Sequence, residues 1–188
     1  MENSIKITGL TKRFGSKVAL DSIDLDIPQG MSGGMQRRLG IAQAIIHDPR
    51  VIIVDEPTAG LDPEERVRFR NMLCEIARDR VVLLSTHIVG DIEATCEEIA
   101  ILNHGHIIFR GRVVEFLNMV SGKVYTATIS TSELESVKER YLVTGILTSD
   151  SLTTVKLIAD EKPFESATSA SADVEDAYMY IMHGQEAV

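Results

Sequence analysis

Two short groups of residues in this chain have types and a spacing that suit a chemical site. Ser32, Gly33 and Gly34 stand where an amphipathic helix is expected to begin. Backbone N–H groups at such a helix end attract an anion, and no side chain here would block its approach. Asp55 and Glu56 end an apolar run, and neighbouring strand residues point to opposite sides. Two structural alternatives stay open, an ordinary N-cap at Ser32 and a pair of carboxylates in an exposed turn.

Three further residues complete the set of candidates. His87 follows a second apolar run at residues 81–84 after two polar residues, although a lone histidine can equally be a structural residue. Phe14 offers a flat ring on which a nucleotide base can stack, and filling the core is the alternative. Asp62 precedes Pro63 and is expected to cap a helix.

Apolar periodicity predicts the elements that must position these residues. Alternation at residues 5–10 and 23–27 predicts two half-buried antiparallel strands. The continuous β-branched run at residues 51–54 is typical of a strand covered on both faces, and residues 81–84 predict a second buried strand. One helix is expected between residue 33 and Asp48, with an apolar side formed by Met35, Leu39, Ala42, Ile45 and Ile46.

The remaining elements belong to two predicted domains. In the first domain we also expect a helix from Pro63 through Ile76 and a hairpin with its turn at Gly105. The composition shifts near residues 121–122, and further strands and helices follow. Their expected positions are residues 124–129, 142–147 and 152–158 for the strands, and 132–141 and 174–182 for the helices. The predicted domains are therefore residues 1–120 and 121–188.

The composition disfavours several classes of function. The 188 residues include 19 basic and 28 acidic side chains, and the net charge of −9 argues against a nucleic-acid-binding surface. No apolar run approaches the roughly twenty residues that span a bilayer, so a membrane role is expected only through a partner. We expect no signal peptide, because no basic region followed by an apolar stretch opens the sequence.

Several motifs, in order, resemble those of ATP-binding cassette (ABC) ATPases. Residues 31–35, MSGGM, resemble the signature loop, with methionines where leucine and glutamine are usual. Residues 51–62, VIIVDEPTAGLD, resemble the Walker B strand and D-loop, and residues 85–87, STH, resemble the switch-histidine loop. Residues 10–21 are similar to the family's opening, which holds the adenine-stacking loop. The resemblance covers about residues 1–116, and residues 33–43 and 174–178 are similar to the multidrug or antibiotic efflux (ABC-2) type.

The resemblance implies a role for each candidate. Asp55 would hold Mg²⁺, Glu56 would polarise the attacking water, and His87 would contact the γ-phosphate and orient that water. The resemblance also implies nucleotide-binding residues. Phe14 would stack on the adenine, and Ser32, Gly33 and Gly34 would contact the γ-phosphate of an ATP held by an opposite subunit. Asp62 would couple the two sites of a dimer.

One motif of the family is missing from this sequence. No G-x-x-x-x-G-K-[ST] phosphate loop (Walker A) occurs, and Gly30 leads directly into the signature-like residues. In the family the phosphate loop, the Q-loop and a helical subdomain intervene, which implies that roughly a hundred residues are missing here. No residue obviously replaces that loop's N–H donors, lysine and hydroxyl. We therefore expect this chain alone to bind ATP weakly and to hydrolyse none.

The missing segment also has a structural consequence. Its strand normally lies beside the Walker B strand, so residues 51–54 are expected to gain an open edge and a bare apolar face. We expect poor solubility unless a partner covers that edge or the sheet closes across the gap.

The predicted fold is α/β, a truncated P-loop NTPase (ABC ATPase) layer with an antiparallel β edge plus a small C-terminal α+β domain. The predicted function is that of an ATP-binding subunit of an ABC efflux transporter, inactive alone. Its expected ligands are ATP and Mg²⁺, and its expected partners are a transmembrane permease and a second ATPase subunit at the inner face of the cell membrane. The alternatives are a signature-loop donor to a complete ATPase subunit and an inert fragment. A DNA-repair or chromosome-organising ATPase is disfavoured because no coiled-coil heptads flank the motifs.

Overall fold

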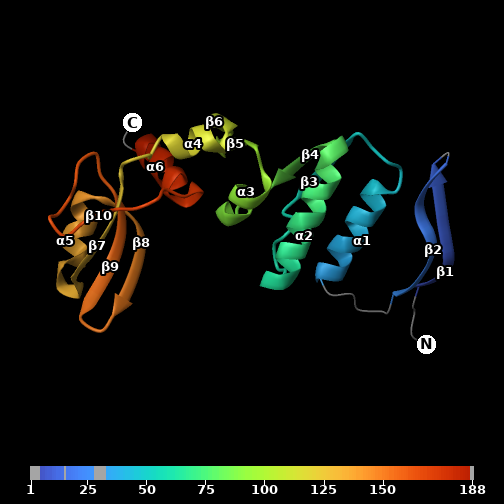
Figure 1. The fold of residues 1–188 in the computed structure, drawn as a ribbon, viewed down its shortest axis with the longest axis horizontal. Coiled ribbons are helices and arrows are strands. Elements are labelled where there is room, and N and C mark those ends of the chain that lie inside the picture. Colours follow the sequence, from blue (N-terminus) through green and yellow to red (C-terminus); the bar gives the residue numbers. More distant parts are fainter. Residues whose placement is uncertain (1–4, 15, 28–32, 187–188) are drawn as a thin grey trace. The chain divides into compact units, whose positions relative to one another are not determined.

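The computed structural model describes residues 5–14, 16–27 and 33–186 (Figure 1). The chain divides into two compact units, Met1–His87 and Ile88–Val188. Both units contain strands and helices, which confirms the predicted mixed α/β fold class. None of the helices within the described ranges combines the length and the apolar character of a membrane span.

The first unit begins with an antiparallel pair of strands. β1 (Ile5–Phe14) and β2 (Lys17–Ile27) pair from Ile5 opposite Ile27 to Phe14 opposite Lys17. The antiparallel pairing predicted from the alternating residues is confirmed, and both strands run further than the alternation indicated.

A β-α-β unit contains or directly precedes half of the candidate residues, namely Asp55, Glu56, Asp62 and His87. β3 (Val51–Asp55) and β4 (Val81–Ser85) pair in parallel, and α2 (Pro63–Ile76) with the 3₁₀ turn η1 (Ala77–Asp79) connects them. Side chains alternate along β3, so Ile52 and Val54 are buried in one cluster with Phe69 and Leu73 of α2. These contacts fix the helix over one face of the two strands.

Helix α1 (Gly33–Ile45) joins the same cluster through a side that only partly matches the predicted one. Ile41 is buried and Ile45 packs beside it, whereas Met35 and Leu39 are 40% and 39% exposed. The predicted apolar side of α1 is therefore confirmed at Ile45 and wrong at Met35 and Leu39. The two-stranded sheet offers only a narrow surface, which residues 41 and 45, one turn apart, are enough to cover.

The other face of the β3–β4 pair is bare. Val51, Ile53, Val81 and Leu83 point to it and are 55%, 72%, 63% and 59% exposed. Burial of β3 on both faces, as a β-branched run suggests, is therefore wrong. The prediction that this pair of strands has an uncovered apolar face is confirmed by these exposed fractions. We name these four residues the bare face.

The second unit opens with one helix, a hairpin and another helix. These elements are α3 (Val89–Thr95), β5 (Glu98–Asn103), β6 (His106–Arg112) and α4 (Val113–Asn118). The predicted turn lies at His104 and Gly105, whose φ angles of +47° and +81° match the left-handed backbone that a two-residue hairpin turn requires.

A four-stranded antiparallel sheet completes this unit. Its strand order is β10 (Thr168–Ser169), β7 (Val124–Ser130), β9 (Leu152–Ile158) and β8 (Leu142–Ser149). The 3₁₀ turn η2 (Thr131–Glu133), α5 (Leu134–Arg140) and α6 (Val174–Glu186) accompany it. One buried cluster includes Val137 of α5, and another gathers residues of α4, α6 and the β5–β6 hairpin. The strands and helices predicted beyond residue 121 are confirmed.

Candidate functional site

The carboxyl ends of β3 and β4 meet because the two strands are parallel and in register. Asp55 pairs with Ser85, and the Ser85 hydroxyl donates a hydrogen bond to Oδ1 of Asp55. The backbone N–H of Glu56 donates to the Ser85 carbonyl at 3.0 Å and lies 3.3 Å from the Ser85 hydroxyl. Ser85 therefore positions the side chain of Asp55 and the backbone of Glu56.

Glu56 and His87 contact each other across the same strand ends. Oε1 of Glu56 lies 2.7 Å from Nδ1 of His87 and accepts the backbone N–H of His87 at 3.1 Å. The other carboxylate oxygen, Oε2, is buried and has no hydrogen-bond partner within the described residues. The imidazole is 72% exposed and the Glu56 side chain 31%. The pair is thus open to solvent on the histidine side and enclosed on the glutamate side.

Glu56 also has an unusual backbone. Its φ of +47° lies in the left-handed region, which costs a residue with a Cβ of the order of 1–2 kcal/mol. The turn that follows is held by the N–H of Ala59 on the Glu56 carbonyl at 3.3 Å. Strain at a residue whose side chain also leaves a buried oxygen unsatisfied is typical of a functional site.

Asp62 ends this turn and caps α2, as predicted. Its side chain accepts the N–H of Glu65 at 2.8 Å, and Pro63 takes the first helical position. The implied role of Asp62 between two subunits stays a prediction.

The remaining predicted residues lie on other elements. Gly33 and Gly34 are the first two residues of α1, and Phe14 is the last residue of β1. Ser32 lies outside the described residues. The structure therefore brings together Asp55, Glu56 and His87, and their catalytic roles stay predictions.

Sequence reasoning missed Ser85 as a member of this group. A signal was present, because both strands are short apolar runs that end in a polar residue. In a parallel pair those end residues lie side by side, so the hydroxyl of residue 85 could be placed against the carboxylate of residue 55.

The donor set fits one side of a magnesium–nucleotide site. A carboxylate and a hydroxyl are the hard oxygen ligands that Mg²⁺ prefers, and Mg²⁺ usually takes one or two carboxylates with substrate phosphates completing its shell. No group of three or more His, Cys, Asp or Glu side chains that could hold a metal occurs in the part of the chain that the structure describes. Asp55 and Ser85 thus fit the metal side of such a site, whereas the sequence holds no phosphate loop.

Comparison with known proteins finds similarity to one family. Residues 3–59 match the sequence model of the ABC transporter family. The chain is 35% identical over 118 residues to the uncharacterized ABC transporter ATP-binding protein YxlF of Bacillus subtilis, covering 63% of this chain and 40% of that protein. It is 36% identical over 111 residues to ABC transporter ATP-binding protein NatA of the same species, covering 58% and 44%.

A third relative matches a shorter segment more closely. The chain is 46% identical over 86 residues to Nod factor export ATP-binding protein I of Rhizobium meliloti, covering 44% of this chain and 25% of that protein. The chain spans less than half the length of each of these three relatives. Residues 3–59 of the chain are thus similar to the ABC transporter family, and the three relatives are ABC transporter or export ATP-binding proteins by name.

Proposed function

We propose that this chain is an ATP-binding subunit of an ABC efflux transporter in incomplete form, and that residues 55, 56 and 87 are the hydrolytic half of its ATP site. The observation that carries the proposal is the contact between Glu56 and His87 across the ends of two parallel strands. Efflux is favoured by the relative whose name describes export of Nod factor. The domain division predicted from the sequence, an ATPase domain at residues 1–120 and a small domain at residues 121–188, is kept here as part of the proposal, and truncation tests whether residues 88–120 belong instead to the second domain.

The geometry gives each of these residues a task. His87 holds Oε1 of Glu56 through two donors, so Oε2 is the oxygen left to accept a proton from an attacking water. That oxygen is buried here, and the site therefore has to open before water can reach it. Ser85 orients Asp55, which would hold Mg²⁺ beside the phosphates of ATP; the metal would neutralise charge on the transferred phosphoryl group.

The same proposal includes that the isolated chain does not hydrolyse ATP. A phosphate loop supplies backbone donors, a lysine and a hydroxyl, and the sequence provides none in its place. The chain would work with a transmembrane permease and a second ATPase subunit, peripheral to the inner face of the membrane.

Calorimetric titration with Mg-ATP tests this proposal. The Glu56→Gln variant is used so that turnover cannot distort the heat, and ATP hydrolysis of the unaltered chain is measured in parallel. We expect neither saturable binding in the micromolar range nor turnover above the Glu56→Gln level. Micromolar binding would show that the chain holds the phosphates of ATP without a phosphate loop, and it would contradict the proposed inactivity of the isolated chain.

A second candidate function is that of a signature-loop donor. Gly33 and Gly34 open a helix of 13 residues, an arrangement that binds anions through backbone N–H groups. In this case the chain would stimulate a complete ABC ATPase subunit, and Gly34→Glu would abolish the stimulation while Glu56→Gln would preserve it. An insoluble chain that stimulates no partner would instead be an inert fragment.

A further inference from the structure

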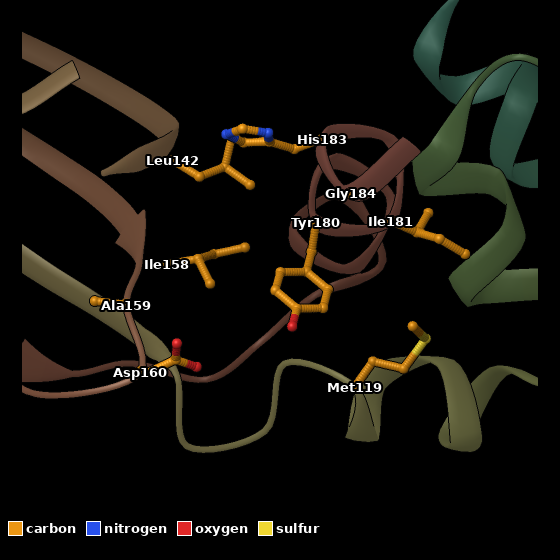
Figure 2. A pocket seen from close by; sticks show the side chains of 9 residues that line it. All are labelled: Met119, Leu142, Ile158, Ala159, Asp160, Tyr180, Ile181, His183 and Gly184. Atoms are coloured by element: carbon orange, nitrogen blue, oxygen red, sulfur yellow. The ribbon is translucent and has the colours of Figure 1, made fainter. Parts of the chain in front are cut away.

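The second unit contains a pocket that the proposed ATPase function does not use. We name it the α6 pocket, and its volume of about 450 Å³ lies within the range of small-molecule sites. Figure 2 shows Leu142, Ile158 and Ala159 on the strand side and Tyr180 on α6, with Met119 below. The walls are mostly aliphatic or aromatic, which suits an apolar ligand body.

The α6 pocket has polar lining side chains in two places, with Asp160 and the Tyr180 hydroxyl on one side and His183 on another (Figure 2). Lys123 does not itself line the pocket, but its side chain contacts both Asp160 and Tyr180. Nζ of Lys123 lies 2.8 Å from the Asp160 carboxylate and donates to the Tyr180 hydroxyl at 3.3 Å. The same ammonium lies 5.1 Å from the centre of the Tyr180 ring.

A count of donors and acceptors indicates what the side with Asp160 and Tyr180 can bind. Within the described residues, Lys123 uses two of its three N–H groups, and the Tyr180 oxygen accepts from it, so the hydroxyl proton of Tyr180 is left to donate. The side chain of Asp160 is 86% exposed, and an ion pair so exposed is weak. A ligand carboxylate can therefore replace Asp160 on Lys123.

A cationic ligand fits this side less well. Its natural position, over the Tyr180 ring and beside Asp160, is where the Lys123 ammonium already lies. Such a ligand would have to displace Lys123 and leave that ammonium without its two partners.

We propose that the α6 pocket binds a small amphipathic monocarboxylate. Lys123 and Tyr180 hold the carboxylate, and Leu142, Ile158 and Met119 contact the alkyl chain. The residues that line this pocket are all different from those of the proposed nucleotide site at residues 55–87.

The first experiment compares three ligands that share one alkyl chain. Octanoate, octanol and octyltrimethylammonium are titrated into the full chain, and the methyl NMR signals of Met119, Leu142 and Ile158 are followed. We expect octanoate to shift these signals saturably and to bind more tightly than octanol by up to about fivefold, since that is the most a partly exposed ion pair contributes. Tighter binding of octyltrimethylammonium, or saturable shifts with none of the three, would overturn the proposal.

Two variants, each of which removes one charge beside the pocket, distinguish a site for anionic ligands from a site for cationic ligands. Lys123→Met should weaken octanoate binding to the level of octanol, whereas Asp160→Asn should strengthen it by removing the competing carboxylate. A cation site would show the reverse order, with Asp160→Asn weakening binding.

A blocking variant tests the location. Gly184 is a residue of α6 that lines the pocket. A Cβ at this position meets nothing within 4 Å, so we expect Gly184→Leu to fold and its side chain to fill the pocket. Gly90→Leu on α3 makes the same change at another helical glycine with open space. Octanoate binding should be lost in Gly184→Leu and kept in Gly90→Leu. Equal binding by both would place the ligand elsewhere and overturn the assignment.

Discussion

At the residue scale, Glu56 combines two features that oppose stability. Its φ of +47° is strained for a residue with a side chain, and Oε2 is buried without a partner within the described residues. What it gains is the contact with His87, whose side chain is 72% exposed. A contact so exposed stabilises the fold little, and the arrangement is therefore better explained by function than by stability.

This conflict predicts the effect of glycine at two neighbouring positions. Glu56→Gly removes the strain and the unsatisfied oxygen, so the free energy of unfolding should stay unchanged or rise by up to about 1 kcal/mol. Asp55 lies in β3 with ordinary strand backbone, and Asp55→Gly should lower the free energy by about 1 kcal/mol. Hydrogen exchange of the β3 and β4 amides measures both. An equal loss in the two variants would mean that residue 56 is unstrained.

At the element scale, the β3–β4 pair separates what sequence reasoning could and could not determine. The β-branched run predicted the strand, because Val and Ile favour extended backbone whatever lies above them. Whether both faces are covered depends on a second layer, which a strand's own sequence does not encode. The same limit applies to α1, where the periodicity predicted a helix and a face, but the narrow sheet beneath it selected Ile41 instead of Met35 and Leu39.

The site shows the same division. The positions of Asp55, Glu56 and His87 after two strands followed from the motif, and the cap at Asp62 followed from the proline beside it. The burial of Oε2 and the left-handed backbone of Glu56 depend on how the turn folds, and no residue type in that turn indicated them.

The bare face predicts self-association that one surface substitution reduces. Ile53 is 72% exposed while its neighbour Ile52 is 3% exposed, so the two isoleucines form a matched pair. Ile53→Thr should reduce light scattering and change the free energy of unfolding by less than about 0.5 kcal/mol. Ile52→Thr should lower that free energy by about 2–4 kcal/mol, because it leaves a cavity and buries a hydroxyl. Unchanged scattering in Ile53→Thr would show that the bare face does not drive association.

Helix α6 is attached to the sheet by a partly buried charge network. Nζ of Lys156 lies 2.6 Å from both Asp173 and Asp176, and Asp176 is 1% exposed and accepts the Thr144 hydroxyl at 2.6 Å. Asp173 and Asp176 also accept each other's backbone N–H, which caps the first turn. The network therefore fixes both the start and the position of α6.

Removal of the cation from this network should be strongly destabilising. Lys156→Met leaves Asp176 buried beside Asp173 without a counter-charge, and the free energy of unfolding should fall by about 2–4 kcal/mol. Lys138→Met is the matched control, since its ion pair with Glu135 is exposed and should change that free energy by less than about 0.5 kcal/mol. Chemical denaturation followed by methyl NMR signals of the second unit compares them. Equal effects would mean that the buried pair gives no more stability than the surface pair.

The same network predicts how stability depends on pH. Burial alone would lower the pKa of Lys156, but hydrogen bonds to Asp173 and Asp176 outweigh it and raise the pKa above 10.5. Burial would raise the pKa of Asp173, but the hydrogen bond from Lys156 lowers it below 3.8. The contribution of Lys156 is complete below pH 10.5 and is lost as pH rises through the raised pKa. That of Asp173 is complete above pH 3.8 and is lost as pH falls through the lowered pKa.

Unfolding curves across pH check these signs in the unaltered chain and in Lys156→Met. The variant should lack the alkaline loss of stability that Lys156 causes and should show a weaker acid loss, because Asp173 no longer has its ammonium partner. An alkaline loss of the same size in both would assign it to another group.

At the scale of the whole molecule, the chain contains two units whose cores are separate clusters. One of the two clusters of the second unit includes Ile101 and Phe116 before residue 120 and Ile158 and Val174 after it. The domain boundary predicted from sequence, at residues 120 and 121, falls inside this cluster, beside the fully buried Val120. A cut there would remove Phe116, which is 0% exposed, and open a cavity in the remaining core.

Truncation decides where the second domain begins. A chain of residues 88–188 keeps the whole cluster and should unfold in one cooperative transition, whereas residues 121–188 should give weak, non-cooperative unfolding and poorly dispersed methyl signals. The loss should be large, since it removes three buried side chains, each of which contributes about 2–5 kcal/mol when deleted singly. Thermal unfolding and methyl NMR of the two fragments compare them directly. If residues 121–188 were as stable as residues 88–188, the boundary read from the composition shift would be the correct one, and the hairpin and α4 would belong to the ATPase domain.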